Sequence, residues 1–180
     1  MRSEENLFRE SAVPGLVCLG IDPGLARMGY GLVRQSGSAV SAVSFGCVET
    51  PSDMAFERRL LCLYEALGEQ MKTCSPDFMC VERLFFGNNR TTAEYVWQAR
   101  GVVMLLAAQR GLPVLEPKPA QVKMAVCGTG TADKTQVQRM VQRILALDAP
   151  PRPDDTADAL AAALAGLAYY EYERKTGGRL

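Results

Sequence analysis

Residues 15–33 have the sequence GLVCLGIDPGLARMGYGLV, an apolar run that ends in one acid, Asp22, directly before Pro23-Gly24. Apolar residues resume a few positions later, so we expect two strands, over 17–22 and 28–35, joined by a turn. Aspartate before Pro-Gly is a common turn former, because its side chain bonds the local backbone and glycine accepts a positive φ. This stretch alone therefore leaves two interpretations of Asp22, a turn residue or a functional carboxylate at a strand end.

The rest of the chain predicts one α/β domain with a mixed five-stranded sheet flanked by helices. Further strands are expected over 39–49, after a hairpin turn at Gly37-Ser38, and over 77–82 and 113–117. Helical spacing and turn signals predict helices over 53–74, 91–110, 119–126, 133–147 and 154–173. Hairpin-linked strands followed by alternating strands and helices are typical of this class. We place the domain at 16–173, with a flexible extension over 1–15 and a short tail over 174–180.

The composition favours a globular protein of a reducing compartment. Of the 180 residues, 48% are apolar and 22% are charged, as in ordinary globular domains. Residues 1–14 lack the apolar core of a signal peptide, and the longest apolar run, 159–170, is too short to span a bilayer. The six cysteines form no C-x-x-C pair, so neither a zinc site nor a disulfide framework is indicated. We expect a cytoplasmic protein with free thiols and no membrane partner.

Two further features bear on chemistry and on partners. The chain contains no histidine, which excludes Ser-His and Cys-His nucleophilic schemes and leaves oxygen ligands, typical of Mg²⁺ or Mn²⁺, for any metal. Residues 83–143 hold nine Lys/Arg against three acids, although the net charge of the whole chain is zero. This basic segment suits a polyanionic partner. A chance clustering of solvated charges is the alternative.

Four carboxylates are predicted to meet at one edge of the sheet. Strand 77–82 ends in Glu82, as the first strand ends in Asp22, and the two acids emerge together if these strands are parallel neighbours. Asp155 and Asp158 share one face of the last helix. Such groups repel one another unless cations neutralise them, and two divalent ions about 4 Å apart would clamp a phosphodiester for attack by water. Each acid alone is equally well a surface residue, but together they predict a metal-dependent phosphotransfer site.

Five blocks of the chain resemble the RuvC family of Holliday-junction resolvases. They are LGIDPG (19–24), VERLFFGNN (81–89), QARGV (98–102), QVKMAVCGTGTADKTQVQ (121–138) and DDTADALA (154–161). The resemblance runs from residue 17 to residue 168 without large gaps. It implies an RNase H-like fold, a homodimer and the resolution of four-way DNA junctions in homologous recombination and DNA repair.

The resemblance also implies a catalytic chemistry. Paired symmetric nicks in strands of like polarity would leave 5′-phosphate and 3′-hydroxyl ends, through hydrolysis with two Mg²⁺ ions per active site, for which Mn²⁺ would substitute. The catalytic and metal-binding residues that it implies are Asp22, Glu82, Asp155 and Asp158.

DNA contacts and partners follow from the same resemblance. Lys123 and Lys134 match positions that contact phosphate near the scissile bond, although isolated lysines are more often simply solvated. Phe85 matches an aromatic residue that inserts at the junction centre, with Phe86 beside it. The alternative is that one of them packs in the core and the other lies under a neighbouring loop or at the dimer contact. Arg90 completes the expected DNA-binding set. Besides junction DNA, the expected partner is the RuvA–RuvB branch-migration complex.

Three rival functions remain at this stage. An actin-like ATPase would also begin with a strand ending in Asp-x-Gly, but it needs a second such lobe, and the chain has no internal repeat. A catalytically silent junction-binding module would explain the basic segment but not four acids at one edge. A related RNase H-like nuclease on another nucleic acid, such as an RNA–DNA hybrid, would share the acids without a reason to dimerise.

The start of the last helix poses one local question, because Asp154 and Asp155 are both spaced to pair with Asp158. Asp154 follows Pro153, where we expect an N-cap residue. We therefore expect Asp155, and not Asp154, to act with Asp158.

Overall fold

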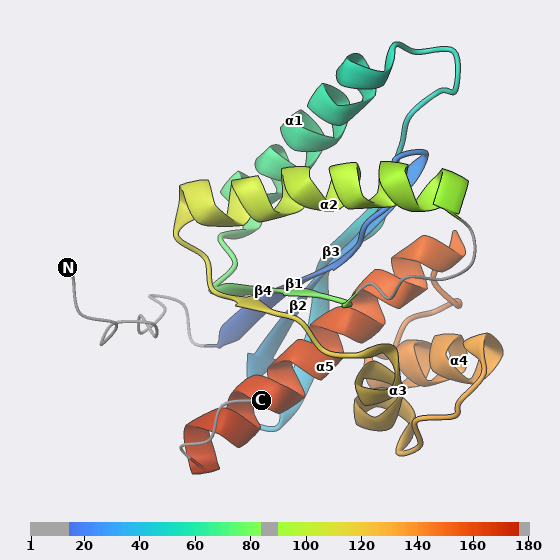
Figure 1. Ribbon diagram of the computed structural model, residues 1–180. Coiled ribbons are helices and arrows are strands. Elements are labelled where there is room, and N and C mark those ends of the chain that lie inside the picture. Colours follow the sequence, from blue (N-terminus) through green and yellow to red (C-terminus); the bar gives the residue numbers. More distant parts are fainter. Residues whose placement is uncertain (1–14, 84–89, 177–180) are drawn as a thin grey trace.

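The computed structural model describes residues 15–83 and 90–176, which form a mixed five-stranded sheet flanked by helices (Figure 1). The strand order is β3-β2-β1-β4-β5. The predicted fold class is therefore confirmed. In chain order the elements are β1 (Leu16–Asp22), β2 (Arg27–Ser36), β3 (Ala39–Glu49), α1 (Phe56–Cys74), β4 (Phe78–Val81), α2 (Arg90–Arg110), β5 (Val114–Leu115), α3 (Pro119–Cys127), α4 (Lys134–Ile144) and α5 (Asp154–Thr176).

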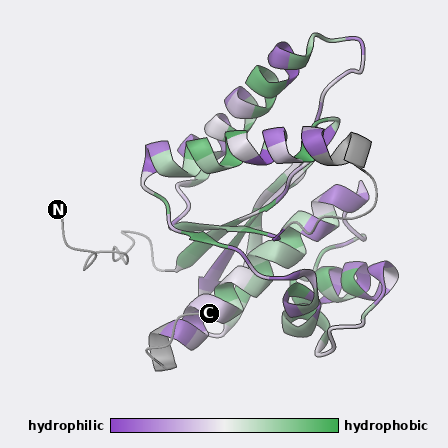
Figure 2. Ribbon diagram, viewed as in Figure 1, coloured by the Kyte–Doolittle hydropathy of each residue, from purple (hydrophilic) through white to green (hydrophobic). Residues whose placement is uncertain are grey.

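Helices cover both faces of the sheet, so its central strand is buried on both sides. Val17, Leu19 and Ile21 of β1 point to the core beneath α1 and α2. Cys18, in the same strand, points to the core beneath α3, α4 and α5. This alternation is the two-residue period of a strand. Hydrophobic residues accordingly concentrate in the central strands and along the middle of α5 (Figure 2).

The register of the central strands brings two acids to one edge. β1 pairs antiparallel with β2 and parallel with β4, with Ile21 opposite Val81. Asp22 and Glu82 are the next residues along these two parallel strands, so both leave the sheet at the same edge, as predicted. The crossover through α1 makes the parallel pairing possible.

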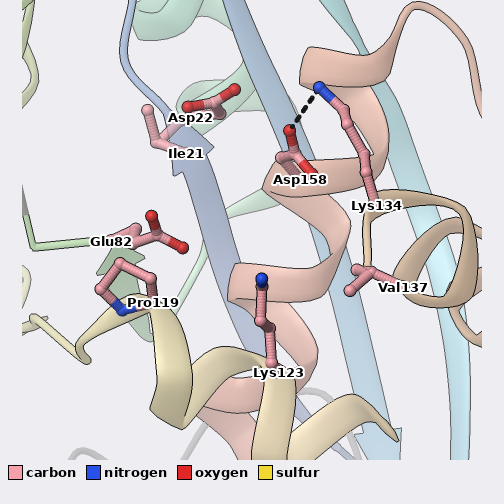
Figure 3. Close-up of a pocket in the computed structure, with 8 residues that line it drawn as sticks. All are labelled: Ile21, Asp22, Glu82, Pro119, Lys123, Lys134, Val137 and Asp158. Atoms are coloured by element: carbon pink, nitrogen blue, oxygen red, sulfur yellow. Dashed lines mark ion pairs between the residues drawn. The ribbon is translucent and has the colours of Figure 1, made fainter. Parts of the chain in front are cut away.

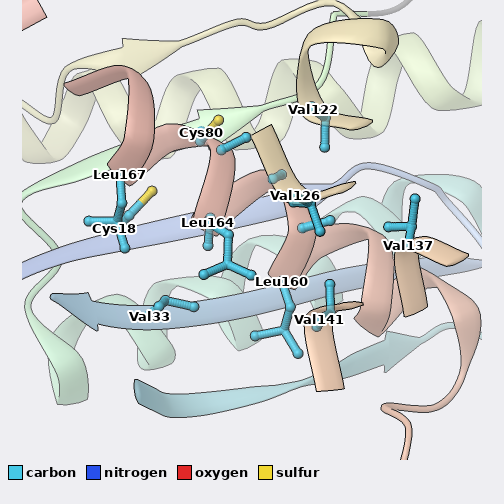
Figure 4. Close-up of a cluster of buried hydrophobic side chains, with 14 of the residues drawn as sticks. Cys18, Val33, Cys80, Val122, Val126, Val137, Val141, Leu160, Leu164 and Leu167 are labelled. Atoms are coloured by element: carbon cyan, nitrogen blue, oxygen red, sulfur yellow. The ribbon is translucent and has the colours of Figure 1, made fainter. Parts of the chain in front are cut away.

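Helix α5 lies directly on the main chain of β1 and β2, because the strands carry glycine where it crosses them. A β-carbon on Gly20 would overlap the main chain of Ala159, and one on Gly29 would overlap the carbonyl of Asp155. Farther along, Leu160 and Leu164 pack with Val33 and with residues of α3 and α4 in one hydrophobic cluster (Figure 4). This close approach places the N-terminal turn of α5 over the edge where β1 ends.

Several element boundaries differ from the predicted ones, each for a local reason. Helix α1 begins at Phe56, because residues 51–54 form a turn in which the Met54 amide donates to the Pro51 carbonyl at 3.3 Å. Strand β5 is only Val114–Leu115, since Pro113 and Pro117 have no amide to donate to the ladder. Helix α4 ends at residue 144, before a residue at 146 with a positive φ, and α5 continues to residue 176 instead of 173.

The state of the cysteines and the character of the helices bear on two further expectations. All six cysteines are free, as predicted; Cys18 and Cys80 are buried, whereas the other four are only partly so. Within residues 15–83 and 90–176, no helix is both long enough and apolar enough to cross a bilayer.

Candidate active site

A cavity of about 320 Å³ opens where β1 and β4 end, between the sheet edge and helices α3, α4 and α5 (Figure 3). Acidic side chains enter it from the strands and from α5, and basic side chains enter from α3 and α4. Its lining consists of Ile21, Asp22, Glu82, Pro119, Lys123, Lys134, Val137 and Asp158.

Three of the four predicted carboxylates face this cavity. Asp22 ends β1, Glu82 follows β4, and Asp158 lies in the first turns of α5. Lys134 lowers the pKa of Asp158, which partly offsets the cost of placing this acid beside two others. The sheet register and the crossing of α5 thus bring together groups that are far apart in the sequence.

The fourth carboxylate, Asp155, is not among the residues that line the cavity, in contrast to the prediction that all four converge there. Its Oδ2 lies 3.1 Å from Nε of Arg27, the first residue of β2, in an ion pair whose acid is 21% exposed. Arg27 therefore draws this carboxylate toward β2. Asp155 is still close enough for its charge to raise the pKa of Asp22.

Lys134 neutralises part of the acidic charge. Its Nζ lies 3.3 Å from Asp154 and 3.4 Å from Asp158, and the second of these pairs is drawn in Figure 3. Burial lowers the pKa of Lys134, but the charge of Asp158 and the bonds to both acids outweigh it and raise this pKa overall. Lys123, across the cavity, lowers the pKa of Glu82.

Burial and the negative charge that the lysines leave unbalanced both raise the pKa values of the acids in the cavity. Burial raises the pKa of Asp22 to about 7, with further contributions from Asp158, Asp155 and Glu82. Burial, together with the charge of Asp158, raises the pKa of Glu82 to about 6. Burial also raises the pKa of Asp158, although Lys134 opposes this effect. The cavity thus concentrates carboxylates at a free-energy cost that a bound cation would relieve.

The donor set fits a hard divalent cation. All candidate ligands are carboxylate oxygens, the type that Mg²⁺ and Mn²⁺ prefer. Burial raises the pKa values of Asp22 and Glu82, and the charges of neighbouring acids raise them further. In the part of the chain that the structure describes, no three acidic or thiol side chains already surround a single point. Lys134 pairs with Asp158 and Arg27 pairs with Asp155, so an ion that binds these acids competes with both ion pairs.

The remaining predicted site residues have different outcomes. Phe85 and Phe86 lie outside the described residues, and Arg90 is the first residue of α2, with a side chain outside the described part. Asp154 was expected to be the N-cap residue, just before the last helix. It is instead the first residue of α5, and its carboxylate pairs with Lys134. Sequence reasoning missed Arg27, whose only signal was a basic residue directly after the Asp22 turn.

The sheet order, the crossing of α5 and the acids at the strand ends define a domain of the RNase H-like class with an acidic site. A family model described as "Crossover junction endodeoxyribonuclease RuvC" matches residues 18–166. The RuvC protein of Desulfitobacterium hafniense is 48% identical over 165 residues, which cover 92% of this chain and 100% of the relative. That of Thermomicrobium roseum is 49% identical over 156 residues, covering 87% and 93%.

Solved structures agree with these relatives. Thermus thermophilus RuvC in complex with a Holliday junction substrate superimposes with a TM-score of 0.83 at 34% identity, covering 87% of this chain and 96% of that one. The yeast mitochondrial resolvase Ydc2, at 16% identity and a TM-score of 0.64, shares the fold. The chain belongs to the RuvC family of crossover junction endodeoxyribonucleases.

Proposed function

We propose that this protein resolves four-way DNA junctions by hydrolysing phosphodiester bonds at the cavity where β1 and β4 end. The observation that carries this proposal is the meeting of Asp22, Glu82 and Asp158 in one cavity with Lys123 and Lys134. Family membership supports the junction as the substrate. A relative of the same family has been solved with a Holliday junction, and the basic segment 83–143 supplies the charge for a polyanion.

The side chains divide the work between holding cations and holding DNA. Asp22, Glu82, Asp155 and Asp158 would hold two Mg²⁺ ions, or Mn²⁺ in their place. When bound, these ions activate the attacking water and neutralise the charge that develops on the phosphate. Lys123 and Lys134 reach the cavity from α3 and α4, and they bind the phosphate on either side of the bond to be cut. The products carry 5′-phosphate and 3′-hydroxyl ends.

A homodimer would present two such sites to two strands of like polarity. The surface of α2 supports this assembly, because large apolar side chains are exposed on it: Trp97 is 39% exposed and Leu105 53%, and their spacing of eight residues places them on the same side of the helix. Gly101, on the same helix, has open space around it. Clustered apolar side chains on a helix surface are typical of a contact with another chain, and a second copy of α2 would cover them.

Family membership also supports expectations about other partners and the cellular location. We expect the RuvA–RuvB branch-migration complex to deliver the junction, and we expect the protein to act in the cytoplasm. Phe85, and Phe86 beside it, would stack on bases at the junction centre. Arg90, at the start of α2, would contact the backbone nearby.

One assay separates this function from its rivals. A synthetic four-way junction, a linear duplex and an RNA–DNA hybrid are each incubated with the protein in Mg²⁺, Ca²⁺ or EDTA. We expect paired nicks in the junction with Mg²⁺ alone, and binding without cleavage in Ca²⁺. Binding without cleavage under every condition would indicate a catalytically silent junction-binding module. Preferred cleavage of the hybrid would indicate a nuclease of another specificity.

A further inference from the structure

The turn over residues 23–26 connects two residues that act on the candidate site. At its start, Asp22 lines the cavity. At its end, Arg27 pairs with Asp155 at 3.1 Å. A shift of this turn would therefore move one carboxylate directly and a second one through its ion pair.

Thr50, the residue that follows β3, anchors this turn through both its main chain and its side chain. Its amide donates to the carbonyl of Ala26 at 3.0 Å, and its hydroxyl donates to the carbonyl of Leu25 at 2.6 Å. Thr50 is only 5% exposed, so water does not replace these bonds readily. The two bonds hold adjacent carbonyls of the turn from one point.

Arg59 of α1 fixes the direction of the Thr50 hydroxyl. Its Nε donates to Thr50 Oγ1 at 2.8 Å, and its Nη2 reaches the Thr50 carbonyl at 3.4 Å. Because a guanidinium only donates, the hydroxyl oxygen accepts from Arg59 and its single proton is directed to Leu25. The chain of bonds runs from α1 through Thr50 to the turn, with one polarity throughout.

We propose that Thr50 and Arg59 are positioning residues that hold the turn over 23–26 so that Asp22 and Asp155 are aligned for divalent cations. This inference rests on the proposed function, since it concerns the same site. Neither residue lines the cavity, and they act through the turn. Groups that hydrogen-bond the ligands themselves change metal affinity or activity by about ten- to a hundredfold when removed, and Thr50, which acts through the main chain of the turn, should fall at the lower end of this range.

Thr50→Val tests the proposal, because valine keeps the shape and the main-chain bond to Ala26 but cannot accept from Arg59 or donate to Leu25. The primary readout is Mn²⁺ binding by isothermal titration without DNA, at a temperature where every variant is folded. Single-turnover cleavage of a junction in Mg²⁺ and junction affinity in Ca²⁺ are measured beside it. We expect a Mn²⁺ dissociation constant and a cleavage rate each worse by about tenfold or more, with junction affinity nearly unchanged.

Three comparison variants make the result specific. Thr50→Ser keeps the hydroxyl and should restore most of the Mn²⁺ affinity. Tyr64→Phe removes a different hydroxyl bond of α1, the one to Gln109 at 2.9 Å, and should leave Mn²⁺ affinity unchanged. Arg59→Leu leaves the Thr50 hydroxyl without its donor and should reproduce the Val phenotype. Because the two residues act as a unit, Thr50→Val combined with Arg59→Leu should cost little more than either change alone.

Two outcomes overturn the proposal. Wild-type Mn²⁺ affinity in Thr50→Val would show that the hydroxyl does not position the acids, and an equal loss in Val and Ser would show that the methyl packing matters instead. If Thr50→Val does not fold, Arg59→Leu and Tyr64→Phe decide the matter by the same titration. Should the wild-type protein bind Mn²⁺ but cut no junction, the proposed function fails while the comparison of Mn²⁺ affinities still stands.

Discussion

Gly29 lies next to two residues that carry carboxylates of the candidate site, Asp22 and Asp155. It is the partner of Asp22 in the antiparallel ladder between β1 and β2, and its main chain lies against that of Asp155 at the start of α5. A β-carbon at this position would overlap the Asp155 carbonyl. The absence of a side chain on one strand residue therefore sets how closely the helix acid approaches the strand acid.

Gly29→Ala should push the first turn of α5 away from the sheet and lower single-turnover junction cleavage by about a hundredfold, because catalytic geometry fails on a displacement near 1 Å. Gly68→Ala is the matched control. A β-carbon there meets its nearest neighbour only at 3.8 Å, an ordinary contact, and should leave the rate unchanged. An undiminished rate in Gly29→Ala would mean that Asp155 does not need this close approach.

Asp22→Asn should keep junction binding and lose cleavage by several orders of magnitude. The carboxylate is proposed to hold both cations, whereas phosphate contacts elsewhere hold the DNA. Junction affinity in Ca²⁺ and single-turnover rate in Mg²⁺ are the two measurements. A variant that still cuts, or that loses binding and cleavage in parallel, would contradict the catalytic role.

Asp155→Asn should abolish turnover, while Asp154→Asn should stay within about tenfold of the wild-type rate. Asp154 has a side chain that is 59% exposed and pairs with Lys134, and such an exposed pair contributes at most about 1 kcal/mol. Single-turnover rates at saturating protein rank the two variants. The reverse order would place Asp154, and not Asp155, at the cations.

Stability in EDTA should fall as the pH rises from about 4 to about 7. The pKa of Asp22 is raised from 3.8 to about 7 by burial and by Asp158, so in this window the folded state binds a proton that the unfolded state has released. The free energy of unfolding, measured with urea at pH 4.5 and 7.5, should drop less in Asp22→Asn. Asp53→Asn, at an exposed position outside the cavity, serves as the control and should behave like wild type.

Mg²⁺ should reverse this loss. Added at pH 7.5, it should raise the free energy of unfolding of the wild-type protein, because a ligand that binds only the folded state stabilises it. The gain should be smaller in Asp22→Asn. An equal gain in both proteins would place the ion elsewhere.

Lys123→Gln should weaken junction binding and reduce its salt dependence. A side chain that neutralises one phosphate contributes about one to the slope of log affinity against log salt concentration. Binding in Ca²⁺ at several salt concentrations gives this slope. Lys72→Gln is the control, since Lys72 pairs with Glu69 on α1 at 3.2 Å and does not line the cavity; a slope unchanged in Lys123→Gln would exclude the contact.

Much of the fold could be predicted because its signals are local. Apolar runs marked β1 and β2, alternation of apolar residues marked β3, and the turn at Gly37-Ser38 was recognisable from its residue types. A crossover of helical length permitted the parallel pairing of β1 with β4, and the structure shows that this pairing brings Asp22 and Glu82 to one edge. Boundaries were less predictable: periodicity did not reveal that Pro113 and Pro117 shorten β5.

The candidate site could be predicted as a set of acids but not as an arrangement. The sequence by itself determined the strands, the helices and the presence of carboxylates at their ends, because propensity, periodicity and turn chemistry act over a few residues. Only the tertiary structure decided that Arg27 forms an ion pair with Asp155 and that Lys134 forms one with Asp158. It also decided that Thr50 hydrogen-bonds the turn between β1 and β2. These contacts join segments far apart in the chain. Their geometry depends on how closely α5 and α1 pack against the sheet, which no local pattern specifies.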